Sequence, residues 1–182
     1  MGLLYRRIGY FEAYSDADFA GDKKERKSTT GVICKHASAA ITWQSKRQKC
    51  VAHSTTVAEY VSAASACKDV VWLKKLLPEC QSDNENFTLY IDNISAIKLI
   101  KNPEFHQRSK HIDIKYHYIR DLYRTGEIKL RYIKTDAQVA DVLTKPLTKY
   151  KFMDLRSKLG LVSKTELYNL KCKENKSDRG RV

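Results

Sequence analysis

Four carboxylates lie at the ends of predicted secondary-structure elements, and their placement constrains the fold more than any other feature of the chain. The first, Asp16, closes an apolar and aromatic run over residues 5–15 that is typical of a β-strand. One aspartate in such a place is more often a turn residue. Acids that a fold gathers at one sheet edge repel one another unless a cation lies among them, and the spacing of all four favours that arrangement. The acids are Asp16, Glu59, Asp92 and Asp141.

The periodicity of apolar residues predicts a mixed α/β domain. Strands are predicted over residues 5–15, 29–35, 39–44, 87–91 and 128–132, and helices over residues 54–77, 93–101, 110–124 and 139–145. Three strands in succession indicate an antiparallel meander, and the later βα units indicate a mixed sheet with helices on its faces. If the strands that end at Asp16 and Asp92 are adjacent and parallel, these two acids meet at the same edge.

The charge balance indicates a polyanionic partner. The 182 residues include 34 Lys and Arg against 21 Asp and Glu, which gives a net charge of +13, and the hydrophobic content of 42% is enough for a folded core. Nucleic acid is the simplest partner of this kind, although a merely soluble basic protein has the same composition.

The cysteines and the hydropathy pattern indicate a cytoplasmic protein. Five cysteines without a C-x-x-C pair suggest neither a disulfide framework nor a zinc site, so we expect a reducing compartment. No apolar run approaches about 18 residues. The first residues also lack the apolar core of a signal peptide. We therefore expect no membrane partner and no secretion.

A short basic run precedes the helix that carries Glu59. Lys46, Arg47 and Lys49 place three positive charges within four residues. Such a run is often only a solvated loop, but contact with nucleic-acid phosphates is an equal alternative. Asn93 is predicted to cap the helix that follows Asp92, and we also expect it to contact nucleic acid.

Six motifs in a fixed order carry a resemblance to a known family. They are Tyr14–Asp22, Arg26–Gly31, Ser54–Tyr60, Asp92–Ala96, Lys110–His117 and Ala140–Pro146. Across residues 5–161 the chain resembles the ribonuclease H domain at the end of the Pol polyprotein of copia-type LTR retrotransposons. The resemblance implies a ribonuclease H-like fold, in which a five-stranded mixed sheet with its first three strands antiparallel is flanked by helices. It also implies hydrolysis of the RNA strand of an RNA–DNA hybrid.

The resemblance assigns the four acids one by one as catalytic residues and metal ligands. It implies two Mg²⁺ ions, for which Mn²⁺ is expected to substitute, because hard cations prefer oxygen ligands. Two such ions can activate a water and stabilise the departing oxygen of a phosphodiester. For Glu59 alone, Thr56-x-x-Glu59 is also a capping-box pattern, which is the structural alternative. The implied partners are the hybrid and the reverse transcriptase region of a parent polyprotein, in the cytoplasm or within virus-like particles.

Three residues depart from the usual motifs of this family and leave a second interpretation open. His53 and Val57 stand where Leu and Glu are usual, and Ile94 stands where Gln is usual. Position 57 is the capping-box position after Ser54. We therefore expect the loss of the glutamate to lower the stability of the fold rather than to alter the chemistry. The alternative function is that of a domesticated or decayed remnant, which binds nucleic acid but cleaves it weakly.

The domain organisation follows from the last elements. We expect one ribonuclease H-like domain over residues 1–161, which a small helix ending at Gly160 completes. Residues 162–182 form a basic polar tail that is expected to be largely disordered.

Overall fold

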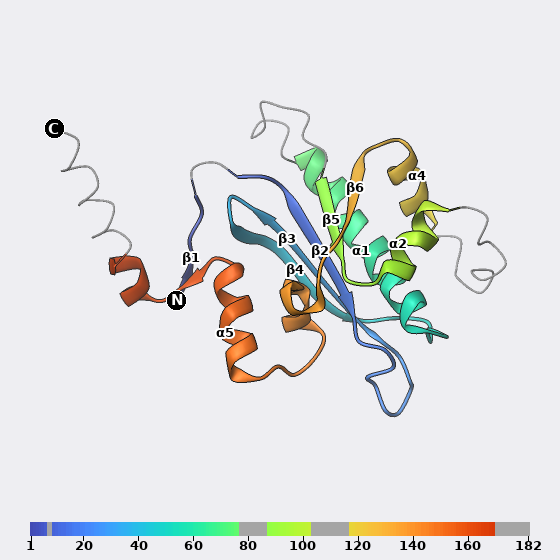
Figure 1. The fold of residues 1–182 in the computed structure, drawn as a ribbon, viewed down its shortest axis with the longest axis horizontal. Helices are drawn as coiled ribbons and strands as arrows, with labels where there is room; N and C mark the ends of the chain where they lie inside the picture. The colour runs from blue at the N-terminus through green and yellow to red at the C-terminus, as the bar shows by residue number, and fades with distance from the viewer. Residues whose placement is uncertain (7–8, 77–86, 103–116, 170–182) are drawn as a thin grey trace.

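A five-stranded mixed sheet forms the centre of the protein (Figure 1). The computed structural model describes residues 1–6, 9–76, 87–102 and 117–169. The strands of the sheet are β2 (Glu12–Ala17), β3 (Thr29–His36), β4 (Ala39–Arg47), β5 (Phe87–Ile91) and β6 (Ile128–Tyr132). They lie in the order β4-β3-β2-β5-β6, with β2, β3 and β4 antiparallel and with β5 parallel to both β2 and β6. The predicted five-stranded sheet with its antiparallel start is confirmed.

Helices cover both faces of the sheet (Figure 1). In chain order they are α1 (Thr55–Leu76), α2 (Ile94–Lys101), α4 (Tyr118–Arg124), the 3₁₀ helices η4 (Thr135–Ala137) and η5 (Val139–Leu143), and α5 (Lys149–Lys158). Successive strand residues face opposite sides of a sheet. Ala13 accordingly packs in one core cluster with α1, α2 and α4, whereas Tyr14 packs in a second cluster with Leu155 of α5. The two clusters fix which helices lie on which face.

Small residues allow α1 to lie close to the sheet. Ala58, Ala63, Ala64 and Ala66 are all completely buried, and the helix packs on both β2 and β3. Close packing of this kind places the first turns of α1 beside the end of β2, where Glu59 is found. No helix among the described residues, α1 included, is long and apolar enough to cross a membrane.

A second, two-stranded sheet joins the beginning of the chain to the end of the domain. β1 (Gly2–Leu3) pairs antiparallel with β7 (Leu161–Val162), directly after α5. Gly160 makes the turn between α5 and β7 possible, because its φ of +77° is in the left-handed region and a Cβ there would lie 2.8 Å from the Ala39 Cα. This pairing is not predicted from the sequence, and it crosses the expected domain boundary at residue 161.

Several predicted boundaries differ from those in the structure. The first strand begins at Glu12 rather than at residue 5, and it contains Asp16 instead of ending before it. β4 extends through Arg47, so the first part of the basic run is strand rather than loop. The predicted helix over residues 139–145 is the 3₁₀ helix η5. The predicted helix over 110–124 lies within the described residues only from residue 117 onward, where α4 is found. Residues 170–182 of the predicted tail lie outside the described residues.

Candidate active site

The parallel pairing of β2 with β5 brings Asp16 and Asp92 to neighbouring positions. Ser15 is opposite Ile91 in the register of the two strands, and the two acids are the next residues along each chain. Asp16 is 1% exposed, while Asp92 follows β5 directly and is partly exposed. The strands that lead to Asp16 and Asp92 are therefore adjacent and parallel. The two acids lie at the same edge of the sheet, as expected for that arrangement.

Asp141 reaches the same edge from η5, which packs tightly on β2 and β3. The fully buried Gln138 donates a hydrogen bond from Nε2 to the Ser15 carbonyl oxygen at 2.9 Å and accepts one at Oε1 from the Ala140 N–H at 3.3 Å. A Cβ at Gly31 of β3 would lie 2.9 Å from the Ala140 carbonyl oxygen, so glycine is needed for this close approach. These contacts hold the buried Asp141 beside β2.

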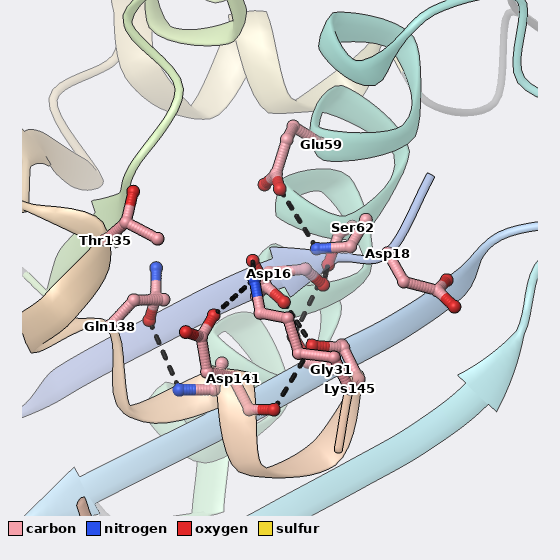
Figure 2. A network of polar contacts seen from close by, with 12 residues as sticks. Asp16, Asp18, Gly31, Glu59, Ser62, Thr135, Gln138, Asp141 and Lys145 are labelled. Atoms are coloured by element: carbon pink, nitrogen blue, oxygen red, sulfur yellow. Dashed lines mark hydrogen bonds and ion pairs between the residues drawn. The ribbon is translucent and has the colours of Figure 1, made fainter. Parts of the chain in front are cut away.

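Three carboxylates converge at this point. Asp16, Asp92 and Asp141 each offer an oxygen, and these oxygens all lie within 4.8 Å of one another. Figure 2 shows Asp16 and Asp141 directed toward the same region between η5 and the sheet. Three hard oxygen donors at this separation, two of them buried, suit a divalent cation. The arrangement could therefore hold a metal ion.

Glu59 approaches the three aspartates from the first turns of α1. Its Oε1 accepts a hydrogen bond from the Ala17 N–H at 3.0 Å, and its Oε2 is buried without a hydrogen-bond partner (Figure 2). Further along α1, the Ser62 hydroxyl donates to the Asp16 carbonyl oxygen at 2.7 Å and joins the helix to β2. The Glu59 side chain is thus directed to the sheet rather than back to Thr56, and its unpaired buried oxygen fits a cation ligand.

Burial raises the pKa values of two of these acids. Desolvation raises the pKa of Glu59 to about 9, and the charges of the neighbouring aspartates add to the rise. Desolvation also raises the pKa of Asp16 to about 6, although the hydrogen bond from Thr144 and the charge of Lys145 oppose this rise. In the absence of a cation, the folded protein therefore favours a protonated Glu59 at neutral pH. A bound divalent ion would favour the ionised carboxylates.

Two lysines and a threonine also contact the acids, and none of the three is among the residues predicted from the sequence. Lys145 Nζ lies 2.8 Å from Asp141 Oδ1 and 3.6 Å from Asp16 Oδ1 (Figure 2). Lys151 Nζ lies 2.7 Å from Asp141 Oδ2, and the Thr144 hydroxyl donates to Asp16 Oδ2. The spacing of four residues between Asp141 and Lys145 is a signal for an ion pair on a helix. No comparable signal in the sequence relates Lys151 to the acids.

The predicted basic residues lie around a separate groove. This groove of about 340 Å³ lies between β4 and α1, and none of the four acids lines it. Lys46 and Lys49 are exposed at its rim. Arg47 also lines it, but its Nη1 lies 2.7 Å from Asp22 Oδ2 and 3.5 Å from Glu25 Oε1, which offsets part of its charge. The structure thus brings Asp16, Asp92 and Asp141 together, with Glu59 beside them but not in that group of three, and leaves the basic run outside the cluster.

Asn93 caps α2, as predicted. Its side-chain oxygen accepts a hydrogen bond from the Ala96 N–H at 2.9 Å. The cap fixes the turn immediately after Asp92 and so helps to define where that acid lies. The next residue, Ile94, is 52% exposed. Contact of Asn93 with nucleic acid stays a prediction.

Comparisons with known proteins relate the chain to transposon proteins. No protein-family model matches it. It is 43% identical over 152 residues to the retrovirus-related Pol polyprotein from transposon TNT 1-94 of Nicotiana tabacum. It is also 43% identical over 150 residues to that from transposon RE1 of Arabidopsis thaliana. These matches cover 84% and 82% of this chain but only 11% and 10% of the two relatives, so the chain spans about a tenth of their length.

A solved structure has the same fold. The N-terminal ribonuclease H domain of a Mycobacterium tuberculosis protein superposes with a TM-score of 0.52, covering 79% of this chain and 96% of that chain at 13% sequence identity. At this identity the likeness concerns the fold alone. The mixed sheet and its flanking helices therefore form a ribonuclease H-like fold.

Proposed function

We propose that this chain, a ribonuclease H-type domain of the retrovirus-related Pol polyprotein family, hydrolyses the RNA strand of RNA–DNA hybrids with the help of divalent metal ions. One observation carries the proposal: the ligand oxygens of Asp16, Asp92 and Asp141 lie within 4.8 Å of one another, beside the buried Glu59. The family likeness supports the choice of a hybrid as the substrate.

The four acids would hold Mg²⁺, or Mn²⁺ in its place. Divalent ions in such a site supply an activated water and stabilise the charge that develops on a phosphodiester during hydrolysis. The protein keeps the donor oxygens close together and largely out of water, through the contacts of Gln138 and Ser62 with β2. Asp92 and Lys145 are partly exposed, and they mark the side from which a phosphodiester can approach.

The basic surface supports a nucleic-acid substrate. The net charge of +13 provides long-range attraction to a polyanion, and the groove lined by Lys46 and Lys49 offers phosphate contacts that do not depend on sequence. Because the aligned relatives are about ten times longer than the matched segment, we include the reverse transcriptase region of a copia-type polyprotein as a proposed partner.

A cleavage assay tests the function directly. The chain is incubated with Mg²⁺ and an RNA–DNA hybrid whose RNA strand is labelled, and with the matching DNA duplex. We expect cleavage of the RNA strand only. Asp16→Asn and Asp92→Asn should each lower the rate by at least about a hundredfold, because each removes a charged ligand from the metal site. Asp154→Asn, at an exposed site on α5, is the matched control and should cleave normally.

Two results would overturn the proposal. Cleavage at an undiminished rate by both Asp→Asn variants would remove the acids from the chemistry. Binding of the hybrid without cleavage by the unmodified chain, in either Mg²⁺ or Mn²⁺, would instead support the decayed remnant that the departures at His53, Val57 and Ile94 suggest.

A further inference from the structure

Two lysines occupy one side of the carboxylate cluster. From this arrangement, and resting on the metal-dependent function proposed above, we propose that Lys145 and Lys151 fill one of the two cation positions. The site then takes a single divalent ion in the absence of substrate, and a second ion binds only when the ammonium groups are displaced. The lysines are positioning residues for the cations, and they set how many ions the site holds.

The contacts of Asp141 carry the first step. Both of its carboxylate oxygens contact an ammonium group: Oδ2 accepts a hydrogen bond from Lys151 at 2.7 Å, and Oδ1 forms an ion pair with Lys145 at 2.8 Å without a hydrogen bond. The carboxylate is completely buried, so these contacts are shielded from solvent far more than surface ion pairs. A metal ion that binds Asp141 would therefore compete with these two ammonium groups for the same carboxylate.

Asp16 connects the two sides of the cluster. Its Oδ2 accepts the hydroxyl of Thr144, and its Oδ1 lies 3.6 Å from Lys145 Nζ, so the ammonium group of Lys145 lies between Asp16 and Asp141 (Figure 2). A metal ion in one position of this cluster would contact both carboxylates. In this structure the ammonium group of Lys145 makes those two contacts.

The opposite side of the cluster has no such contact with the lysines. Neither Lys145 nor Lys151 forms an ion pair with Glu59 or Asp92. Oε2 of Glu59 is buried without a hydrogen-bond partner beside the three aspartates, whose ligand oxygens lie within 4.8 Å of one another, and it suits a position for one divalent ion on this side.

The charges agree with this division. Two ammonium groups offset two of the four carboxylates when all are ionised. The remaining charge is neutralised by one divalent ion rather than by two. Two divalent ions together with two lysines would place more positive than negative charge in a largely buried site, which is unfavourable in a medium of low dielectric constant.

Calorimetric titration with Mn²⁺ tests the inference on the full chain without nucleic acid. We expect the unmodified chain to bind one ion, and the Lys145→Met/Lys151→Met variant to bind two. The affinity for the second ion should rise by about tenfold or more, the scale on which groups around metal ligands tune affinity. Lys145→Arg keeps the charge and should keep one ion. Lys158→Met, which removes an exposed ion pair with Asp154 on α5, is the control and should match the unmodified chain.

The outcomes separate this inference from the proposed function. Two ions of similar affinity on the unmodified chain, or an unchanged isotherm for the folded double variant, would overturn the role of the lysines. If the double variant does not fold, Lys151→Gln alone must raise the affinity for the second ion. An unchanged affinity for that ion would also overturn the role of the lysines. Absence of any Mn²⁺ binding would overturn both proposals. Binding of one ion without hybrid cleavage would overturn the function alone and leave the lysine assignment intact.

Discussion

Glu59 Oε1 accepts a hydrogen bond from the backbone N–H of Ala17 at 3.0 Å, across 42 residues of sequence. The bond joins the first turns of α1 to the residue directly after Asp16. The strand that carries Asp16 therefore also sets the position of Glu59. Because the bond is made to a backbone group, it depends on the course of β2 and not on the conformation of another side chain.

The raised pKa of Glu59 predicts that stability depends on pH when no metal is present. The folded pKa is about 9 against an ordinary value of 4.5, so the folded state binds a proton that the unfolded state has released. The stabilisation is complete below the ordinary pKa and is lost as the pH rises through the folded one. In EDTA, we expect the melting temperature to fall by at least about 4 °C between about pH 5 and about pH 9.

The variant Glu59→Gln identifies the group responsible. It cannot ionise, so the loss of stability above about pH 6, where the contribution of Asp16 ends, should largely disappear. Asp154→Asn should keep the full pH dependence of the unmodified chain. Melting curves in EDTA measure both variants, and an equally steep decline for Glu59→Gln would contradict the assigned pKa.

Gln138 is predicted to be essential for holding η5 in place. It is fully buried, and it makes hydrogen bonds to Ser15 and Ala140. Replacement by Leu leaves the Ser15 carbonyl oxygen buried without its partner, at a cost of about 1–3 kcal/mol. Urea denaturation should show this destabilisation, and Mn²⁺ affinity should fall as well, because Asp141 follows three residues later. Asp136→Asn, at an exposed position of η4, should leave both quantities unchanged.

The basic groove should contribute to binding of the hybrid through phosphate interactions. Each phosphate interaction that a substitution removes should decrease the slope of log affinity against log salt by about 0.7–0.9. Lys46→Ala and Lys49→Ala should each have this effect. Arg47→Ala should have a smaller one, because Asp22 and Glu25 already offset its charge. If the slope of the triple variant equals that of the unmodified chain, in fluorescence anisotropy at several salt concentrations, the groove is not part of the nucleic-acid interface.

One departure from the family motifs places an apolar side chain where a capping-box glutamate is usual. The absence of a capping-box glutamate at position 57 predicts lower stability. Val57 is instead 7% exposed and belongs to the main hydrophobic core, while its N–H still donates to the Ser54 hydroxyl at 3.2 Å. Val57 is thus buried in the core, and the lower stability expected from the missing glutamate stays a prediction. The capping-box motif describes hydrogen bonds between residues close in sequence. It does not predict which side chains of the helix are buried.

Local patterns were sufficient to predict the sheet, most of its helices and the four candidate acids. Alternation of apolar residues along Phe87–Ile91 and Ile128–Tyr132 depends only on neighbours in sequence, and both strands have the predicted bounds. The cap at Asn93 is equally local. Long-range contacts determined the rest: the ammonium group of Lys151 on Asp141, the bond from Gln138 to Ser15, and the pairing of β1 with β7. Lysine and glutamine are common at protein surfaces, and only the packing of η5 and α5 on the sheet brings Lys151 to a buried acid and Gln138 to the carbonyl oxygen of a buried strand residue. Periodicity can therefore place a carboxylate at the end of a strand, but the charges that surround it depend on which distant segments fold against it.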